Sequence, residues 1–383
     1  MLCHLVVIPK GGRGPPAGVA ELLSSPFPPL SEFRFVDSFR HGQWSSAHGT
    51  VHFAGWETEA DLHGTGPSWH ASEDSLSAVS GSLRLRGGVR RGGKSVAAMF
   101  ADHLDSENPA RIAEACDGVY TAIRLDSSGT GAALTDVLGL RHLYAGENDQ
   151  VFAVSTQAEA VAQILAQLSG PERDVVGVAG LAFSGFLIGN RTGFTGVRRL
   201  DPGEAVALES TRPAQPARFE VYDPAPWSSG RDLDSLSRSD LVTLFAAELI
   251  EGVRVAAEAR VEHRRADITG GRDSRLILAA ILQDGLQDRF RFRTLGADDL
   301  GDVEIGTSIA RALDLDHSAG RGFDPAPPEQ RSASFESRAR RFVAATGGTV
   351  NLWDDELVRT PLPQIHLCGL GGEVLRTYWP KRQ

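Results

Sequence analysis

The sequence predicts an α+β fold of antiparallel sheets in its first half and an α/β domain with a parallel sheet in its second half. Its 383 residues suffice for two or three domains of about 150 residues each. Short apolar runs separated by turn residues fill the first half, whereas strands and helices alternate in the second. A polar, proline-rich segment over 211–230 separates the halves. We therefore expect one domain over 1–210, a linker over 211–232 and a second domain over 233–383.

The first half contains few helical patterns and many strand patterns. Apolar residues recur at helical spacing over 109–116 and 156–168, so we expect helices there. Between residues 186 and 208, several glycines and a Pro-Gly turn precede a short apolar strand. Apolar runs predict further strands over 2–8, 33–39, 51–56 and 151–155. Helices packed on antiparallel sheets would explain this pattern.

The second half begins with a long predicted helix. Ser237 or Ser239 is suited to its N-cap, and an apolar stripe runs from Leu241 toward Ala259. A short strand then ends at Ile268 and is followed by a glycine loop. The remaining expected elements are a helix over 276–282, a strand over 290–295 and a helix over 303–313.

The glycine loop after Ile268 is the main candidate for a ligand site. It consists of Thr269, Gly270, Gly271, Arg272, Asp273, Ser274 and Arg275. Paired glycines let a ligand approach the backbone, hydroxyl groups add donors, and the start of a helix favours an anion. A carboxylate beside phosphate oxygens is reasonable when a magnesium ion lies between them. The loop therefore predicts a phosphate site, although a plain strand-to-helix turn would use the same glycines.

A second glycine-rich string matches the GxxxxGK[ST] pattern of nucleotide triphosphatases. It runs Gly88-Val89-Arg90-Arg91-Gly92-Gly93-Lys94-Ser95. That mechanism requires a buried strand before the loop and a long helix after it. The preceding residues are half polar, and only residues 96–103 follow before acidic sequence. We expect a chance match, and an ATPase built on this string is a minor alternative.

Charge and cysteine content restrict the partners. With 39 Lys and Arg against 49 Asp and Glu, the net charge of −10 argues against nucleic acid or an anionic membrane as main partner. No apolar run approaches the roughly 18 residues of a membrane span. Cys3, Cys116 and Cys368 lie far apart and indicate neither disulfides nor structural zinc. We expect a reduced, cytoplasmic protein.

Several segments resemble the asparagine synthetase family. TGGRDS at 269–274 is similar to its SGGxDS pyrophosphate loop, and CGLGGE at 368–373 to its later SGxGxDE segment. Between them, a strand, an acidic stretch, a helix and His317 follow in the family's order. In the first half, DVLGLRHLY at 136–144 is similar to the DxxGxxPLYY element, and RRLDPGE at 198–204 to the LxPGE turn. The resemblance covers most of the chain.

The resemblance implies a four-layer glutaminase-like (Ntn-type) sandwich followed by an α/β parallel-sheet ATP pyrophosphatase domain. Such a domain uses ATP to convert a carboxylate into an acyl-adenylate, releasing pyrophosphate, and an amine then attacks. By position, ATP and pyrophosphate would be held by Thr269, Gly270, Gly271, Asp273, Ser274, Arg275, Leu295 and Gly369. Mg²⁺ would be bound by Asp273 and Glu373. For Arg275, a phosphate contact and a solvent-exposed place at the helix start remain equally open, and no catalytic residue is assigned.

The first domain departs from the family at its nucleophile. Glutamine hydrolysis in the family needs an N-terminal cysteine, exposed by removal of Met1. Here Leu2 follows Met1 and the thiol belongs to Cys3, so we expect no glutaminase activity and a buried structural role for Cys3. β-Lactam synthetase relatives also lack the nucleophile and take the amine from their substrate. Some lasso-peptide cyclases carry out a related reaction on a peptide.

The second domain departs from the family near the end of the chain. Leu370 replaces an acidic residue, which weakens the case for ammonia-dependent asparagine formation. The chain ends five residues after Tyr378, whereas relatives continue to a lysine above the acyl-adenylate. We therefore expect the second domain to be incomplete at its C-terminus.

Our leading hypothesis is an ATP- and Mg²⁺-dependent amide ligase without glutaminase activity. Its carboxylate substrate would be an amino acid or a peptide. The amine would come from a separate donor or from a precursor peptide itself. The alternatives are a catalytically impaired nucleotide-binding pseudoenzyme or fragment and, with least weight, the ATPase.

Overall fold

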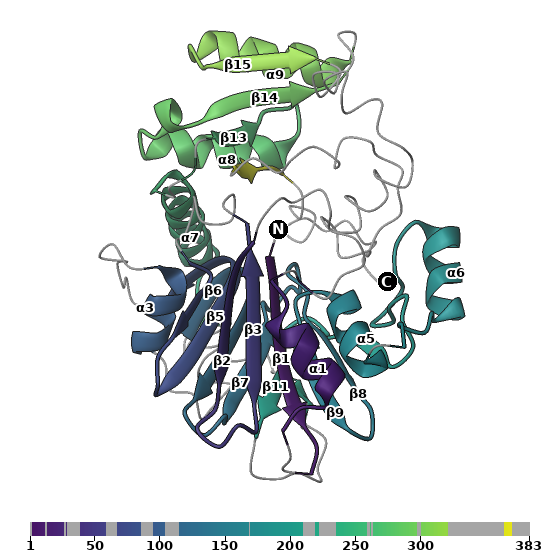
Figure 1. Ribbon diagram of the computed structural model, residues 1–383. Coiled ribbons are helices and arrows are strands. Elements are labelled where there is room, and N and C mark those ends of the chain that lie inside the picture. The colour runs from purple at the N-terminus through teal and green to yellow at the C-terminus, as the bar shows by residue number, and fades with distance from the viewer. Residues whose placement is uncertain are drawn as a thin grey trace. The chain divides into compact units, whose positions relative to one another are not determined.

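The protein was analysed as a computed structural model. It describes residues 2–11, 14–26, 28, 39–58, 67–85, 95–103, 115–167, 169–209, 219–221, 235–258, 261, 263–296, 300–320 and 364–369. The described residues fall into two compact units, one ending at Val221 and one beginning at Ser235 (Figure 1).

Two antiparallel sheets form the first unit. One sheet contains β1 (Leu2–Pro9), β2 (Arg40–Ser45), β3 (His52–Glu57), β8 (Tyr144–Glu147), β9 (Val151–Ser155) and β10 (Val197–Arg199). The other contains β4 (Trp69–Ala71), β5 (Ser75–Leu85), β6 (Cys116–Asp126), β7 (Gly131–Thr135), β11 (Glu204–Leu208) and β12 (Phe219–Val221). Within the described chain their orders are β10-β8-β9-β1-β3-β2 and β12-β11-β7-β6-β5-β4, and neighbouring strands run antiparallel.

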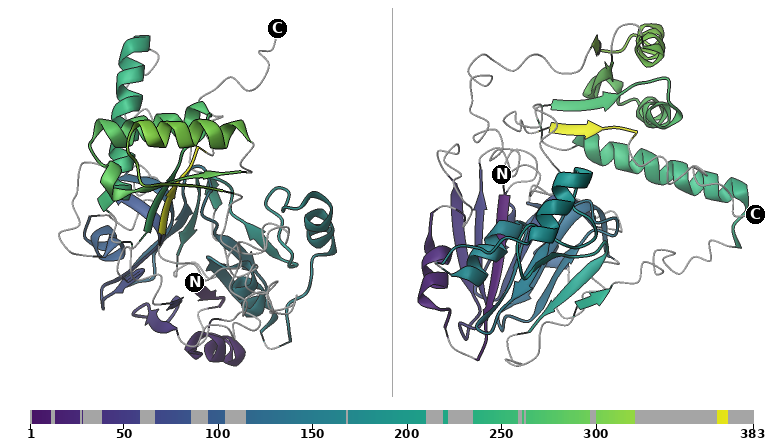
Figure 2. Two further views of the ribbon diagram at one scale, coloured as in Figure 1. Left: turned by 90° about the horizontal axis from the view of Figure 1, so that it is seen from above. Right: turned by 90° about the vertical axis from the view of Figure 1, so that its right-hand side faces the viewer.

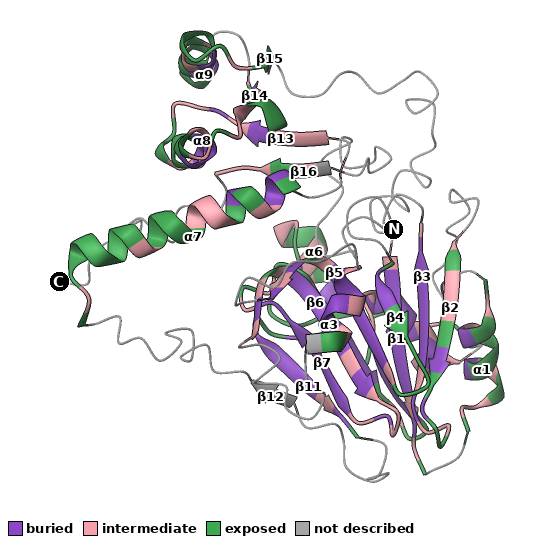
Figure 3. Ribbon diagram, turned by 90° about the vertical axis from the view of Figure 1, so that its left-hand side faces the viewer, coloured by how far each residue is buried: buried purple, intermediate pink, exposed green. Residues whose placement is uncertain are grey.

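The sheets pack against each other through an apolar core. Alternate residues of a strand point to the same face, and those facing inward are apolar. Phe53 and Val154 from one sheet and Leu76, Ile123 and Val206 from the other are each at most 1% exposed. Figure 3 shows how much of these strands is buried. One core of this unit therefore lies between the two sheets.

Helices cover the outer faces of both sheets. Helices α1 (Ala17–Ser24) and α5 (Ala158–Ala166) pack on the sheet that contains β1, through Leu23 and Ile164 among others. Helix α3 (Val96–His103) packs on the other sheet, with Phe100 fully buried. The first unit is therefore layered helix, sheet, sheet, helix.

The predicted elements of the first half are partly confirmed. β1, β3, β9 and α5 lie where the sequence predicts three strands and a helix. The predicted strand over 33–39 and helix over 109–116 fall outside the described residues except near their C-terminal ends, where Cys116 begins β6. The predicted linker over 211–232 is described only at β12, so the domain boundaries stay predictions.

Helix α6 (Val175–Ser184) was not predicted. The Asp174 carboxylate accepts hydrogen bonds from the backbone N–H groups of Val176 and Gly177, which caps the helix. Gly185 closes it with a left-handed φ of 82°. Phe183 is 95% exposed, so this apolar side chain does not lie in the core of the unit.

The second unit is an α/β structure. Its elements are α7 (Arg238–Glu258), β13 (His263–Asp267), α8 (Arg272–Gln283), a 3₁₀ turn (Gln287–Arg289), β14 (Arg291–Leu295), α9 (Gly301–Ala312), β15 (His317–Gly320) and β16 (Gln364–Leu367). The strands are parallel and ordered β15-β14-β13-β16 within the described chain. Figure 2 shows β16, in yellow, beside the green strands. The predicted parallel sheet is confirmed.

The helices of the second unit share one core with the sheet. Val253 of α7, Ile281 of α8 and Ala310 of α9 belong to the same buried cluster as Ala266 and Phe292 of the strands. The outward-facing residues of the strands are more polar, so this core lies on one face of the sheet.

Helix α7 begins at a capping box. The Ser237 hydroxyl accepts a hydrogen bond from Asp240 N at 3.2 Å and donates one to the Asp240 carboxylate at 2.7 Å. Ser237, rather than Ser239, is therefore the N-cap. None of the helices in the described parts of the chain is both long and apolar enough to cross a membrane.

Candidate functional site

The loop over 269–271 lies at the carboxyl edge of the parallel sheet. It joins β13 to α8, and α9 follows β14 at the same edge. β14 and β15 lie on one side of β13, whereas β16, which is later in the chain, lies on the other. Ligands of open α/β sheets bind outside the carboxyl ends of the strands, where the strand order reverses. The predicted phosphate loop therefore occupies the expected position for a ligand.

Two side-chain hydroxyl groups hold the loop in shape by hydrogen bonds. The backbone N–H of Thr269 donates to Ser274 Oγ at 3.1 Å, and Gly271 N donates to Thr269 Oγ1 at 2.9 Å. The two hydroxyl oxygens lie 2.9 Å apart. The structure thus brings together the predicted residues Thr269, Gly271 and Ser274 at the start of a 12-residue helix, α8.

Both loop glycines have close neighbours. A Cβ atom on Gly270 would lie 2.9 Å from Asp302 Oδ1 and 2.9 Å from Ile305 Cδ1. A Cβ atom on Gly271 would lie 3.0 Å from Thr269 Oγ1. A side chain at either position would displace these neighbours, so the paired glycines allow the backbone to come close to the first turn of α9 and to the loop itself.

Gly369, predicted as an ATP-binding residue, lies against the first turn of α8, and its role stays a prediction. It comes two residues after the end of β16, which pairs with β13. A Cβ atom on Gly369 would lie 3.0 Å from Ser274 N and 3.1 Å from Asp273 Cβ. The segment after β16 therefore touches the first turn of α8, although it is far from that turn in the sequence.

Some of the other predicted site residues lie near the loop, and some lie outside the described residues. Leu295 ends β14 at the same edge and is 37% exposed. Arg275 folds back along the helix, since its Nε donates to Gly271 O at 3.2 Å in an exposed position. Asp273 lies in the first turn of α8. Glu373 and Leu370 lie outside the described residues, as does the 88–95 string except Ser95.

The predicted magnesium site is not assembled by the described residues alone. Within that part of the chain, no three His, Cys, Asp or Glu side chains gather in a group that could hold a metal ion. Asp273 is in place at the loop, and its predicted partner Glu373 is not among the described residues. Magnesium binding therefore stays a prediction.

Sequence reasoning missed two polar contacts at this edge. Asp302, the second residue of α9, accepts a hydrogen bond from Gly270 N at 2.8 Å. Thr294 Oγ1 donates to Ile268 O at 2.6 Å and lies 2.9 Å from His317 Nε2. The only signal for Asp302 was the acidic stretch after the second strand of this half.

Burial lowers the pKa of His317 below its ordinary value of 6.5. The neutral imidazole therefore predominates at neutral pH. Because the Thr294 hydroxyl already donates to Ile268 O, His317 donates its Nε2–H to the Thr294 oxygen. This chain of hydrogen bonds connects β15, β14 and the end of β13 next to the loop.

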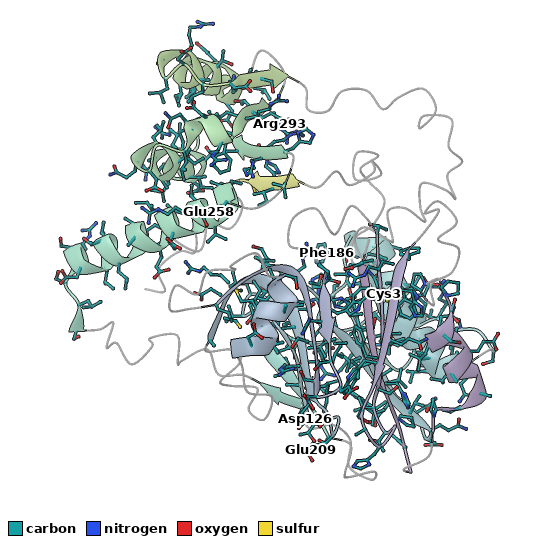
Figure 4. The ribbon with its side chains drawn as sticks, turned by 60° about the vertical axis from the view of Figure 1, so that its left-hand side comes forward. Cys3, Asp126, Phe186, Glu209, Glu258 and Arg293 are labelled. Carbon is teal, nitrogen blue, oxygen red and sulfur yellow. The ribbon has the colours of Figure 1, made fainter. Side chains whose placement is uncertain are left out.

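Cys3 belongs to the buried cluster that the β1 sheet of the first unit shares with helices α1 and α5 (Figure 4). It is in β1, is 1% exposed, and its Sγ is 3.7 Å from Ser155 Oγ. Burial raises the pKa of the Cys3 thiol to about 12. The thiolate, which is the reactive form, is therefore scarce at neutral pH.

We expect iodoacetamide to leave Cys3 unmodified in the native protein at neutral pH. Cys368 is only partly buried and will be labelled first, whereas unfolding in urea will expose both thiols. Peptide mass spectrometry after timed labelling distinguishes the two sites. Native labelling of Cys3 at the rate of Cys368 would contradict the burial described here.

No protein-family model matches the chain, and no curated protein matches it. One similar solved structure is glutamine phosphoribosylpyrophosphate amidotransferase from B. subtilis complexed with ADP and GMP, with 11% identity and a TM-score of 0.33 over 86% of this chain and 70% of that chain. Another, described as the allosteric regulatory enzyme of purine biosynthesis, has 12% identity and a TM-score of 0.33 over 87% of this chain and 70% of that chain. Likenesses at this level carry no argument about function, and membership of the asparagine synthetase family stays a prediction.

Proposed function

We propose that the second unit binds the phosphates of ATP at the 269–275 loop and transfers AMP to a carboxylate, as an amide ligase of the asparagine synthetase type. One observation carries the proposal. The glycine loop lies at the carboxyl edge where the strand order reverses, and Gly369 touches the beginning of α8. Both glycine segments bring backbone close to the first turn of α8, where the helix dipole favours an anion.

The side chains at the loop suit a polyphosphate. Thr269 and Ser274 supply hydroxyl groups, and Arg275 supplies a guanidinium group beside Gly271. A guanidinium stabilises the charge of a departing pyrophosphate. A bound magnesium ion would polarise the phosphate oxygens, and Asp273 would help to hold it. By the same proposal, Leu295 and Gly369 lie beside the adenosine.

The first unit supports a ligase that does not hydrolyse glutamine. We take its layering of helix, sheet, sheet and helix as an Ntn-type sandwich that has lost the nucleophile. The thiol of Cys3 is buried and neutral, so it is unsuited to attack an amide. The attacking amine would then belong to a separate donor or to the peptide substrate.

The substitution Asp273→Ala is expected to lower the affinity for Mg²⁺ and ATP at least about tenfold, or about 1.4 kcal/mol. Titration calorimetry measures the affinity, and release of pyrophosphate and AMP with a panel of amino acids and peptides measures turnover. Lys94→Ala serves as the matched control and will leave both unchanged.

Other outcomes identify the alternatives. Loss of binding only in Lys94→Ala, with ADP and phosphate as products, would assign the activity to the 88–95 string. Binding at the loop without any pyrophosphate release would favour the pseudoenzyme. Ammonia release from glutamine would contradict the role given to the first unit.

A further inference from the structure

Asp302 contacts the loop that the proposed function takes to be the phosphate site. Its Oδ1 accepts the hydrogen bond of Gly270 N at 2.8 Å. A carboxylate oxygen and a phosphate oxygen use the same kind of donor and carry the same sign of charge. One donor of the loop is therefore already engaged by an anionic group of the protein.

Asp302 lies at the start of a helix, beside the glycine loop. It is in the first turn of α9, where the helix dipole stabilises a negative charge. The absence of a side chain on Gly270 allows the contact, since a Cβ atom there would lie 2.9 Å from the same carboxylate oxygen. The first turn of α8 contributes a second carboxylate, Asp273, next to the loop. A phosphate that enters the loop thus meets two carboxylates.

We propose that Asp302 determines which form of phosphate the loop accepts. It competes with a metal-free polyphosphate for Gly270 N and repels it, whereas a divalent cation that accompanies the polyphosphate neutralises Asp302 and Asp273. The inference rests on the proposed function, because it takes the loop to be a phosphate site. Asp302 is a specificity-determining residue in this account and has no part in proton transfer.

The substitution Asp302→Asn removes the charge and keeps an oxygen that can accept the bond from Gly270 N. Inorganic pyrophosphate is the probe, titrated into the full chain with Mg²⁺ or with EDTA. Wild-type protein is expected to bind it at least about 100-fold more weakly in EDTA. Asp302→Asn is expected to bind metal-free pyrophosphate at least about tenfold more tightly than wild type does.

Glu304→Gln provides the matched control. Glu304 lies in the same turn of α9 and is exposed, so this change removes the same charge from the same helix start. We expect the control to alter metal-free binding by less than about twofold, because the bond from Gly270 N goes to Asp302, and the Glu304 charge acts on the loop only through solvent and salt that screen it. Asp302→Ser replaces the asparagine variant if thermal unfolding shows that the latter does not fold.

The outcomes separate this inference from the proposed function. If neither wild type nor variant binds pyrophosphate with Mg²⁺, the loop is not a phosphate site. If wild type binds equally well in Mg²⁺ and EDTA, the loop assignment stands and the role of Asp302 is overturned. If Asp302→Asn weakens binding in both conditions, Asp302 only holds the loop in place, which also overturns the inference.

Discussion

Replacing Gly369 with valine will lower the affinity of the protein for pyrophosphate and ATP by about 100-fold, or about 2.7 kcal/mol. The reason is steric. Even a Cβ atom at this position would lie 3.0 Å from the backbone nitrogen of Ser274, and the two γ-methyl groups of valine add to the overlap. The first turn of α8 would have to move away from the segment after β16. Calorimetric titration with pyrophosphate in Mg²⁺ measures the loss.

Gly252→Val is the matched control for this experiment. Gly252 lies within α7, has no atoms near the position of a Cβ, and takes valine at no cost in helix propensity. Equal losses of affinity in both variants would show that the effect comes from general destabilisation. Unchanged affinity in Gly369→Val would remove Gly369 from the proposed site.

Arg40→Met is expected to lower the free energy of unfolding of the first unit by about 3–5 kcal/mol. Arg40 pairs with Glu57, whose side chain is completely buried, and Glu57 Oε2 also accepts a hydrogen bond from Ser68 N at 2.9 Å. Loss of the arginine leaves a buried carboxylate without its counter-charge. Hydrogen exchange of peptides from β1 to β3 in increasing urea reads this unit separately from the second.

Replacing the partner of Arg40, as Glu57→Gln, is expected to lower the free energy of unfolding by less than Arg40→Met does. Arg40 is 41% exposed, so its guanidinium group can be hydrated in Glu57→Gln, and the glutamine oxygen can still accept from Ser68 N. We expect a loss of about 1–2 kcal/mol. The double variant should be more stable than Arg40→Met alone, which a double-mutant cycle tests. Equal losses in the two single variants would contradict this asymmetry.

The sequence predicts the local elements around the candidate site well. The alternation of strands and helices gives the parallel sheet, and the placement of the glycine loop between β13 and α8 follows from the residues on either side of Ile268. Ser237 and Ser239 are both good caps, and only the hydrogen bonds with Asp240 distinguish them. The sequence therefore limits the N-cap of α7 to two serines, and the hydrogen bonds of the folded chain identify Ser237.

Hydrophobic periodicity in the sequence does not predict helix α6. Its residues are apolar on several sides, so the sequence contains no amphipathic signal, and Val175 is 77% exposed in the structure. Its ends do carry signals, since Asp174 is a good N-cap and Gly185 a good C-cap. Attention to the caps would have found this helix.

Asp302 was missed for a different reason. Its contact with Gly270 joins residues on two successive strand-to-helix connections, and no local pattern indicates which carboxylate of an acidic stretch will reach across. A role for Gly369 in ATP binding could be predicted only by resemblance, because a short strand such as β16 has no distinctive pattern of its own.

The position of β16 has a consequence for how the protein folds. β13, β14 and β15 are linked by short crossovers, whereas β16 pairs with β13 although Gln364 follows Asp267 by nearly a hundred residues. Closing so long a stretch of chain costs entropy, which slows the pairing. The three local strands can therefore assemble first, and Gly369 reaches the loop only when β16 adds to the sheet. A ligand that requires Gly369 would stabilise that last step, so its binding would follow the slowest phase of refolding.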